Sequence, residues 1–184
     1  MELNEVIEMI NSTGMVLNDR NINYKVVVFG GSGFLGHALI ERLLLKGHNN
    51  ITAVARNEGG LVALKEKFPS VTIQVGDIAD TWTVKKAMVA ADEVYLLSAL
   101  KHVGIAETDV RACVESNIIG HMNVINESLT TQPRLLMFIS SDKAAQGTGV
   151  YGMTKKIGEK LMLEAEKINR ETKYRTVRYG NGLY

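Results

Sequence analysis

A glycine-rich turn between a buried strand and a helix is the feature that most constrains the fold. The run Lys25–Phe29 is apolar and rich in β-branched residues, which is typical of a strand buried on both faces of a parallel sheet. It leads directly into the turn Gly30–Gly36, and helical periodicity follows from Leu35 to Lys46. Gly47 stands where a helix stop is expected. This order of strand, tight turn and helix predicts the first unit of an α/β fold.

The rest of the chain repeats this alternation. Further strands are expected over Ile51–Ala55, Val71–Val75, Glu93–Ser98, Leu135–Ser140 and Arg175–Tyr179, and further helices over Leu61–Lys67, from a cap at Asp80 to Ala90, over Glu107–Thr130 and over Val150–Arg170. Parallel neighbours need crossover connections, so we expect a Rossmann-type, doubly wound parallel sheet of six or more strands in the order 3-2-1-4-5-6. Residues 24–184 form this domain, and residues 1–23 form an N-terminal extension with a short helix over Glu2–Ile10.

Composition narrows the possible partners. The 184 residues are 46% apolar and 22% charged, which fits one globular domain, and the net charge of +1 gives no reason to expect nucleic acid or an anionic membrane as a partner. There is no long apolar stretch, and the acidic start lacks the order of a signal peptide, so a cytoplasmic location is expected. The single cysteine, Cys113, allows no internal disulfide, and the four histidines show no metal-ligand spacing, so no metal is expected.

The glycine turn has the properties of a phosphate-binding loop. Glycine lets the backbone approach a pyrophosphate, and the helix that follows supplies free N–H groups. Gly30, Gly33 and Gly36 are spaced as in the extended branch of the short-chain dehydrogenase/reductase superfamily, which this part of the chain resembles. We therefore expect the turn to bind NADP or NAD through Gly30, Ser32, Gly33, Phe34, Leu35 and Gly36. A plain strand–helix connection is the alternative.

The residue after the second strand bears on the choice of cofactor. Arg56 can bind the 2′-phosphate of NADP, whereas an acidic residue there would bind the ribose hydroxyls of NAD, a role that nearby Glu58 could still play. Arg56 thus favours NADP, with NAD as the other possibility. Asp77 and Ile78 stand where the superfamily contacts the adenine ring, although Asp77 also suits a simple turn.

Tyr151 and Lys155 form the first candidate catalytic pair. Their spacing places both side chains on one helix face, and a lysine charge near a phenol lowers the pKa of the phenol. Tyr151 could then take a proton from a sugar hydroxyl. Surface residues paired by chance are the alternative. Lys155, Lys156 and Lys160 together are expected to form a solvated helix face.

Five segments together resemble the inverting UDP-N-acetylglucosamine 4,6-dehydratases of polysaccharide biosynthesis. They are Ser140–Ala145 with Tyr151–Lys155, Ser98–Val103, Ser116–Val124 and Arg178–Asn181. The resemblance implies further cofactor contacts from Ser98, Ala99, Leu100, Lys101, Asn117, Ser140, Ser141, Tyr151 and Lys155, and substrate contacts from Lys101, His102 and Asn181. It also implies a UDP-sugar as substrate.

The resemblance further implies a mechanism. Tyr151 would act as base while hydride leaves C4 of the sugar, and Lys155 would hold the cofactor ribose. Lys143 would then remove the C5 proton, and Asp142 would protonate the departing C6 hydroxyl. A lysine in place of the glutamate of other sugar 4,6-dehydratases accompanies inversion at C5. Without the flanking motifs, Asp142 and Lys143 would be interpreted as a surface ion pair.

The chain departs from this family in several places. Compared with the family it resembles, the chain is expected to be truncated after the sixth strand and to lack most of the substrate-binding part. Gly104 stands in place of a usual proline, and Gln146–Gly149 makes the loop before Tyr151 rich in glycine. Two alternatives therefore stay open: an NAD(P)-binding module without turnover, and another small NAD(P)-dependent oxidoreductase or epimerase that uses Ser140 or Ser141.

The remaining expectations concern packing. Trp82 and Cys113 are expected in the core or partly buried, and Met153, Leu161, Met162 and Leu163 are expected to pack their helix. The helices predicted over 107–130 and 150–170 are those through which many relatives dimerise, so a homo-oligomer is expected.

Overall fold

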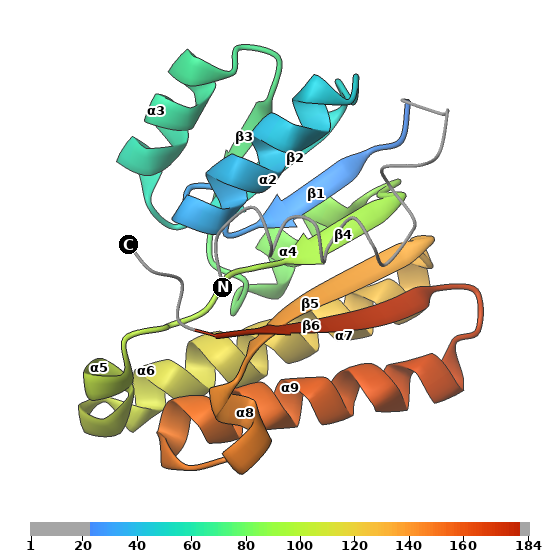
Figure 1. The fold of residues 1–184 in the computed structure, drawn as a ribbon. Helices are drawn as coiled ribbons and strands as arrows, with labels where there is room; N and C mark the ends of the chain where they lie inside the picture. Colours follow the sequence, from blue (N-terminus) through green and yellow to red (C-terminus); the bar gives the residue numbers. More distant parts are fainter. Residues whose placement is uncertain (1–22, 181–184) are drawn as a thin grey trace.

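A single parallel sheet with helices on both faces forms the domain (Figure 1). The structure is a computed structural model and describes residues 23–180. The strands are β1 (Val26–Phe29), β2 (Ile51–Ala55), β3 (Thr72–Val75), β4 (Glu93–Leu96), β5 (Leu135–Ser141) and β6 (Lys173–Tyr179). They pair in the order β3-β2-β1-β4-β5-β6, and every pair is parallel. The predicted fold class and strand order are therefore confirmed. The helix expected over Glu2–Ile10 lies outside the described residues.

The helices follow the predicted crossovers, with one exception. They are α2 (Phe34–Leu45), α3 (Glu58–Lys67), α4 (Thr81–Met88), α5 (Val103–Thr108), α6 (Val110–Val114), the π-helix η1 (Glu115–Ile119), α7 (Gly120–Thr131), α8 (Lys143–Gln146) and α9 (Gly149–Ile168). The single helix predicted over 107–130 is broken once, at Asp109, which ends α5 and whose side chain caps α6 by accepting from the amide of Ala112. From Val110 to Thr131 the chain is helical without a gap through α6, η1 and α7, as predicted. The π turn then shifts the register before α7 begins.

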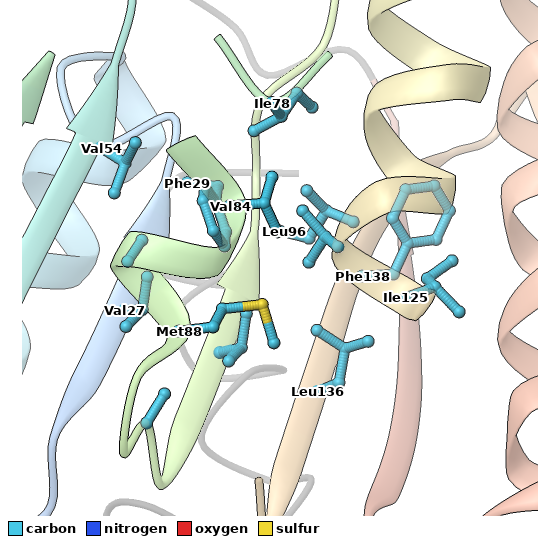
Figure 2. Close-up of a cluster of buried hydrophobic side chains, with 14 of the residues drawn as sticks. Val27, Phe29, Val54, Ile78, Val84, Met88, Leu96, Ile125, Leu136 and Phe138 are labelled. Atoms are coloured by element: carbon cyan, nitrogen blue, oxygen red, sulfur yellow. The ribbon is translucent and has the colours of Figure 1, made fainter. Parts of the chain in front are cut away.

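The sheet separates two hydrophobic cores. Alternate residues of β1 point to opposite faces: Val26 and Val28 pack with α2 and α3, whereas Val27 and Phe29 pack with α4, α7 and α9. Figure 2 shows the second core, in which Val27 and Phe29 lie beside Met88 of α4. Because every strand pair is parallel, the carboxyl ends of the strands meet along one edge of the sheet.

Several side chains differ from their predicted environments. Trp82 is 72% exposed, because α4 turns Val84 and Met88 toward the sheet and leaves Trp82 on its outer side. Met153 and Leu163 of α9 are also exposed, whereas Cys113 and Met162 are buried as expected.

The predicted solvated lysine face of α9 is wrong for one of its members. Lys155 is only 2% exposed, because it lies on the face of α9 that packs against β5, whereas Lys156 and Lys160 are exposed as predicted. No helix within residues 23–180 is both long and apolar enough to cross a membrane.

Candidate active site

Close backbone contacts build the glycine turn after β1. Gly30 has a φ of +89°, and a Cβ there would lie 2.7 Å from the amide nitrogen of Ser98. A Cβ at Gly36 would lie 2.4 Å from the carbonyl oxygen of Gly30. Both positions therefore require glycine. Helix α2 begins here with no side-chain cap and no acidic residue in its first turn, which leaves its N-terminal amides suited to an anion.

A cavity of about 460 Å³ opens beside this turn, at the carboxyl edge of the sheet. It is lined by residues 30, 32–36, 55–57, 76, 78, 97–102, 116 and 179. The wall includes every predicted residue of the glycine turn, together with Arg56, Ile78 and the segment 98–102. The hydroxyl of Ser98 is buried in this wall without a hydrogen-bond partner among residues 23–180. A glycine cradle, a helix N-terminus and an unused hydroxyl are the features that a dinucleotide cofactor needs.

Arg56 and Asp77 meet at the β2 and β3 side of the cavity. The Nη1 atom of Arg56 lies 3.4 Å from Oδ2 of Asp77, and both side chains are partly exposed. Asp77 also accepts a hydrogen bond from the amide of Ala79. Asp77 therefore supports the turn and partly neutralises Arg56, but it does not itself line the cavity. Asn57, which sequence reasoning missed, does line it and caps α3; its position just before a helix is the signal that could have found it.

Asn117 supports the cavity wall from behind. Its side-chain oxygen accepts from the amide of Leu100, and its Nδ2 donates to the carbonyl of Leu100 and to Oγ1 of Thr154. The residue is fully buried in the π-helix η1, where no cavity surface reaches it. Asn117 thus joins the segment after β4 to helix α9.

Tyr151 and Lys155 lie side by side on the buried face of α9. Burial raises the pKa of Tyr151 to about 12, with the neighbouring Tyr179 acting in the same direction, and only the hydrogen bond with Ser141 lowers it. The sequence argument expected a lowered phenol pKa, but here burial outweighs any effect of the lysine. Burial also lowers the pKa of Lys155 to about 7. The Nζ atom of Lys155 donates to the carbonyl of Ile139 at 2.8 Å.

Asp142 and Lys143 follow β5 directly. Their charged groups are 3.5 Å apart, and Oδ1 of Asp142 accepts from the amide of Lys143 at the start of α8. A hydrogen bond from Ser141 and the charge of Lys143 hold the pKa of Asp142 below its usual value. Both side chains reach solvent, so this geometry suits a surface ion pair as well as a pair of catalytic groups.

The family of polysaccharide biosynthesis proteins matches residues 26–184. The chain belongs to this family. It is 33% identical over 162 residues to an uncharacterised membrane protein of Methanocaldococcus jannaschii, covering 86% of this chain and 49% of the relative. It is 31% identical over 172 residues to the inverting UDP-N-acetylglucosamine 4,6-dehydratase of Campylobacter jejuni, covering 90% of this chain and 50% of the relative.

Solved structures agree with the fold. Pen from Bacillus thuringiensis is 30% identical and superposes with a TM-score of 0.85, covering 89% of this chain and 52% of Pen. A UDP-glucose 4-epimerase from Brucella ovis, solved in complex with NAD, is 21% identical with a TM-score of 0.74, covering 86% of this chain and 52% of the epimerase. The likeness to this epimerase shows the fold alone. The chain spans about half the length of the relatives that it matches.

In this member of the polysaccharide biosynthesis family, Tyr179 connects the cavity to the candidate catalytic groups. It lines the cavity, its carbonyl accepts from the amide of Asp142 at 3.0 Å, and it acts to raise the pKa of Tyr151. Sequence reasoning missed Tyr179, although its place at the end of the last strand was a usable signal. Asn181, predicted to contact substrate, lies outside the described residues. The hydroxyl of Ser140 donates to Glu159 and does not reach the cavity.

Proposed function

We propose that this chain binds NADP and carries the acid–base groups of a UDP-N-acetylglucosamine-type 4,6-dehydratase that inverts C5. The observation that carries the proposal is the cavity between the glycine turn and the segment 97–102, with Tyr179 joining it to Asp142 and Tyr151. Similarity to the Campylobacter jejuni dehydratase supports the reaction class. Because the chain spans about half of that relative, the activity of the whole protein is part of the proposal.

The cofactor site uses the groups that the cavity presents. The amides of the glycine turn and of the α2 N-terminus would bind the pyrophosphate, and Ser98 would use its buried hydroxyl toward the cofactor. A bound nicotinamide would supply the hydride-accepting and hydride-returning chemistry. Phe34, which is 66% exposed at the rim of the cavity, would cover the bound cofactor and exclude water.

Tyr151 and Lys155 would move the first proton. With its pKa at about 12, the phenol is protonated at neutral pH and must lose its proton before it can act as base. Lys155, with a pKa near 7, is able to take up and release protons in the working range. The pair would therefore share one proton, with Ser141 completing the hydrogen-bonded chain to the sugar hydroxyl.

Asp142 and Lys143 would perform the elimination. Lys143 would take the C5 proton as a neutral amine, and Asp142 would give its proton to the C6 hydroxyl as water departs. The charge of Lys143 is one cause of the low pKa of Asp142, so a neutral lysine lets Asp142 hold a proton more tightly. The ion pair would thus couple the protonation of Asp142 to that of Lys143.

A second candidate is a module that binds the cofactor without turning over a sugar. The exposure of Asp142 and Lys143 favours it, since catalytic groups are usually less open to water. An epimerase or other small oxidoreductase using Ser141 beside Tyr151 is a variant of the same proposal.

Calorimetric titration with NADP and NAD, followed by NMR of UDP-N-acetylglucosamine, separates these candidates. The dehydratase is expected to bind NADP and to form a 4-keto-6-deoxy sugar. The variant Tyr151→Phe should retain nucleotide binding and lower product formation by about 1,000-fold, because it lacks the proton-transferring hydroxyl. Binding with an unchanged sugar would support the module, and no binding of either nucleotide would contradict the proposal.

Arg56 is expected to set the preference for NADP. Arg56→Gln should weaken NADP binding about tenfold and leave NAD binding unchanged, because only NADP carries the 2′-phosphate that the guanidinium would bind. Arg111→Gln is the matched control: Arg111 forms a similar exposed ion pair, with Glu115, away from the cavity. Equal losses for both nucleotides in Arg56→Gln would contradict this assignment.

A further inference from the structure

Glu159 of α9 connects the carboxyl ends of two strands to one helix. Its Oε1 accepts from the hydroxyl of Ser140 at 2.6 Å and from Nε of Arg178 at 2.7 Å, and its Oε2 accepts from Nη2 of Arg178 at 2.6 Å. Ser140 belongs to β5 and Arg178 to β6, where the two residues are paired in register. The carboxylate side chain is 12% exposed, so these hydrogen bonds form largely out of water.

Glu159 lies one helical turn after Lys155, on the same face of α9. The two side chains bind consecutive residues of β5: Lys155 donates to the carbonyl of Ile139, and Glu159 accepts from the side chain of Ser140. The Nζ atom of Lys155 also lies 4.8 Å from the ring centre of Phe138. Two consecutive residues of β5 therefore hold the side chains of Lys155 and Glu159 in place.

We propose that Glu159 is a positioning residue for Lys155: its carboxylate holds the ends of β5 and β6 against α9 and supplies a negative charge, one helical turn away, that favours the buried ammonium. No bond of Glu159 leads into the cavity, so it acts through Lys155 and Ser140. The part that Lys155 plays toward a cofactor rests on the proposed function. The hydrogen bonds of Glu159 with Ser140 and Arg178 do not depend on it.

The charges around Lys155 support this role. Burial lowers the pKa of Lys155, whereas Cys113 on α6 and Glu159 act to raise it. Burial raises the pKa of the Cys113 thiol, so at neutral pH the thiol is uncharged and the negative charge comes from Glu159. His121 on α7 adds no positive charge, because burial and the charge of Lys155 lower its pKa to about 3. Burial also acts to raise the pKa of Glu159, but its hydrogen bonds from Arg178 and Ser140 outweigh this and lower it. Glu159 thus stays ionised at neutral pH.

The chain offers a matched control on the same two elements. Glu166 of α9 and Arg175 of β6 form a second ion pair at 3.5 Å, with side chains 42% and 41% exposed. It joins the same helix to the same strand but lies nearly two turns farther from Lys155. If Glu159 only held α9 against β6, Glu159→Gln and Glu166→Gln would have the same effect on the titration of Lys155.

The test is an NMR titration of lysine side chains in the full chain, with the Lys155 signal assigned from its loss in Lys155→Met. Glu159→Gln should lower the titration midpoint of Lys155 by about one unit, because an opposing charge is removed at low effective dielectric. Glu166→Gln should leave the midpoint unchanged. Equal shifts in both variants, or no shift in Glu159→Gln, would overturn the proposal.

A second variant keeps the test decisive if Glu159→Gln does not fold. Arg178→Gln retains the carboxylate and removes two of its hydrogen bonds, so the Lys155 midpoint should not fall, while NADP binding weakens several-fold. A fall in the midpoint would contradict the assigned source of the charge. If the natural chain bound no nucleotide, the proposed function would fail, yet the Lys155 titration measured without nucleotide would still test Glu159.

Discussion

Lys155→Met is expected to raise the free energy of unfolding at pH 6 by an amount on the order of 3 kcal/mol. The natural side chain is fully buried, and burial lowers its pKa from 10.5 to about 7 in the folded protein. Below pH 7 the folded state must therefore hold an ammonium in a poor environment. Methionine has a similar length and carries no charge, although its lack of an N–H leaves the carbonyl of Ile139 without this donor.

The sign of the pH dependence follows from the same shift. Between pH 7 and 10.5 the unfolded chain binds more protons at this lysine than the folded chain, so the stability of the natural protein rises with pH in that range. The advantage of Lys155→Met should accordingly shrink by about 2 kcal/mol between pH 7 and pH 9. Urea unfolding at pH 6, 7 and 9 measures both quantities.

Lys156→Met is the control for this experiment, because Lys156 is the exposed neighbour on the same helix. It should change stability little at any of these pH values. If Lys155→Met destabilised the protein at pH 6, the ammonium would have to be better solvated or better paired than its burial indicates. Nucleotide binding by Lys155→Met should be lost, so the substitution would exchange function for stability.

Gly36→Val should be the most damaging single change in the glycine turn. A Cβ at this position would lie 2.4 Å from the carbonyl oxygen of Gly30 and 2.7 Å from that of Gly31, and backbone atoms cannot move aside as a flexible side chain can. We expect a loss of about 3 kcal/mol in the free energy of unfolding, because the turn and the start of α2 must shift apart. Thermal unfolding and nucleotide titration would both report the change.

Gly104→Ala is the matched control for a glycine at a helix start. A Cβ there meets nothing within 4 Å, and the residue lies inside α5. The substitution should stabilise the protein by about 0.5 kcal/mol, because alanine favours a helix more than glycine does. A Gly36→Val variant as stable as Gly104→Ala would show that the turn is more adaptable than its contacts indicate.

The sequence predicted the sheet well because burial on both faces leaves a strong pattern. Apolar runs such as Val26–Phe29 and Leu135–Ser140 identify their strands, and the parallel crossovers then determine the strand order. The break at Asp109, between α5 and α6, was not predictable from periodicity, because no proline or glycine stands at this position.

The candidate site also contains residues that the sequence predicted and residues that it did not. The residues of the glycine turn and the segment after β4 carry local motifs, and both line the cavity as expected. Glu159 carries no motif, and the role of Tyr179 was not predicted although it lies in the segment Arg178–Asn181, because both roles arise from contacts between elements distant in the chain. The pKa of Tyr151 was predicted in the wrong direction because sequence spacing does not measure burial.

The wall of the cavity also has a consequence for folding order. It includes the first strand–helix turn near Gly30 and Tyr179 at the end of β6, so this wall forms only after β6 has joined the sheet. Contacts between such distant segments form late and slowly. A nucleotide that binds this wall would therefore recognise only the fully assembled sheet, and at one hundred times its dissociation constant it would add about 2.7 kcal/mol to the stability of that state. Such a ligand would therefore stabilise the assembled sheet before it takes part in any reaction.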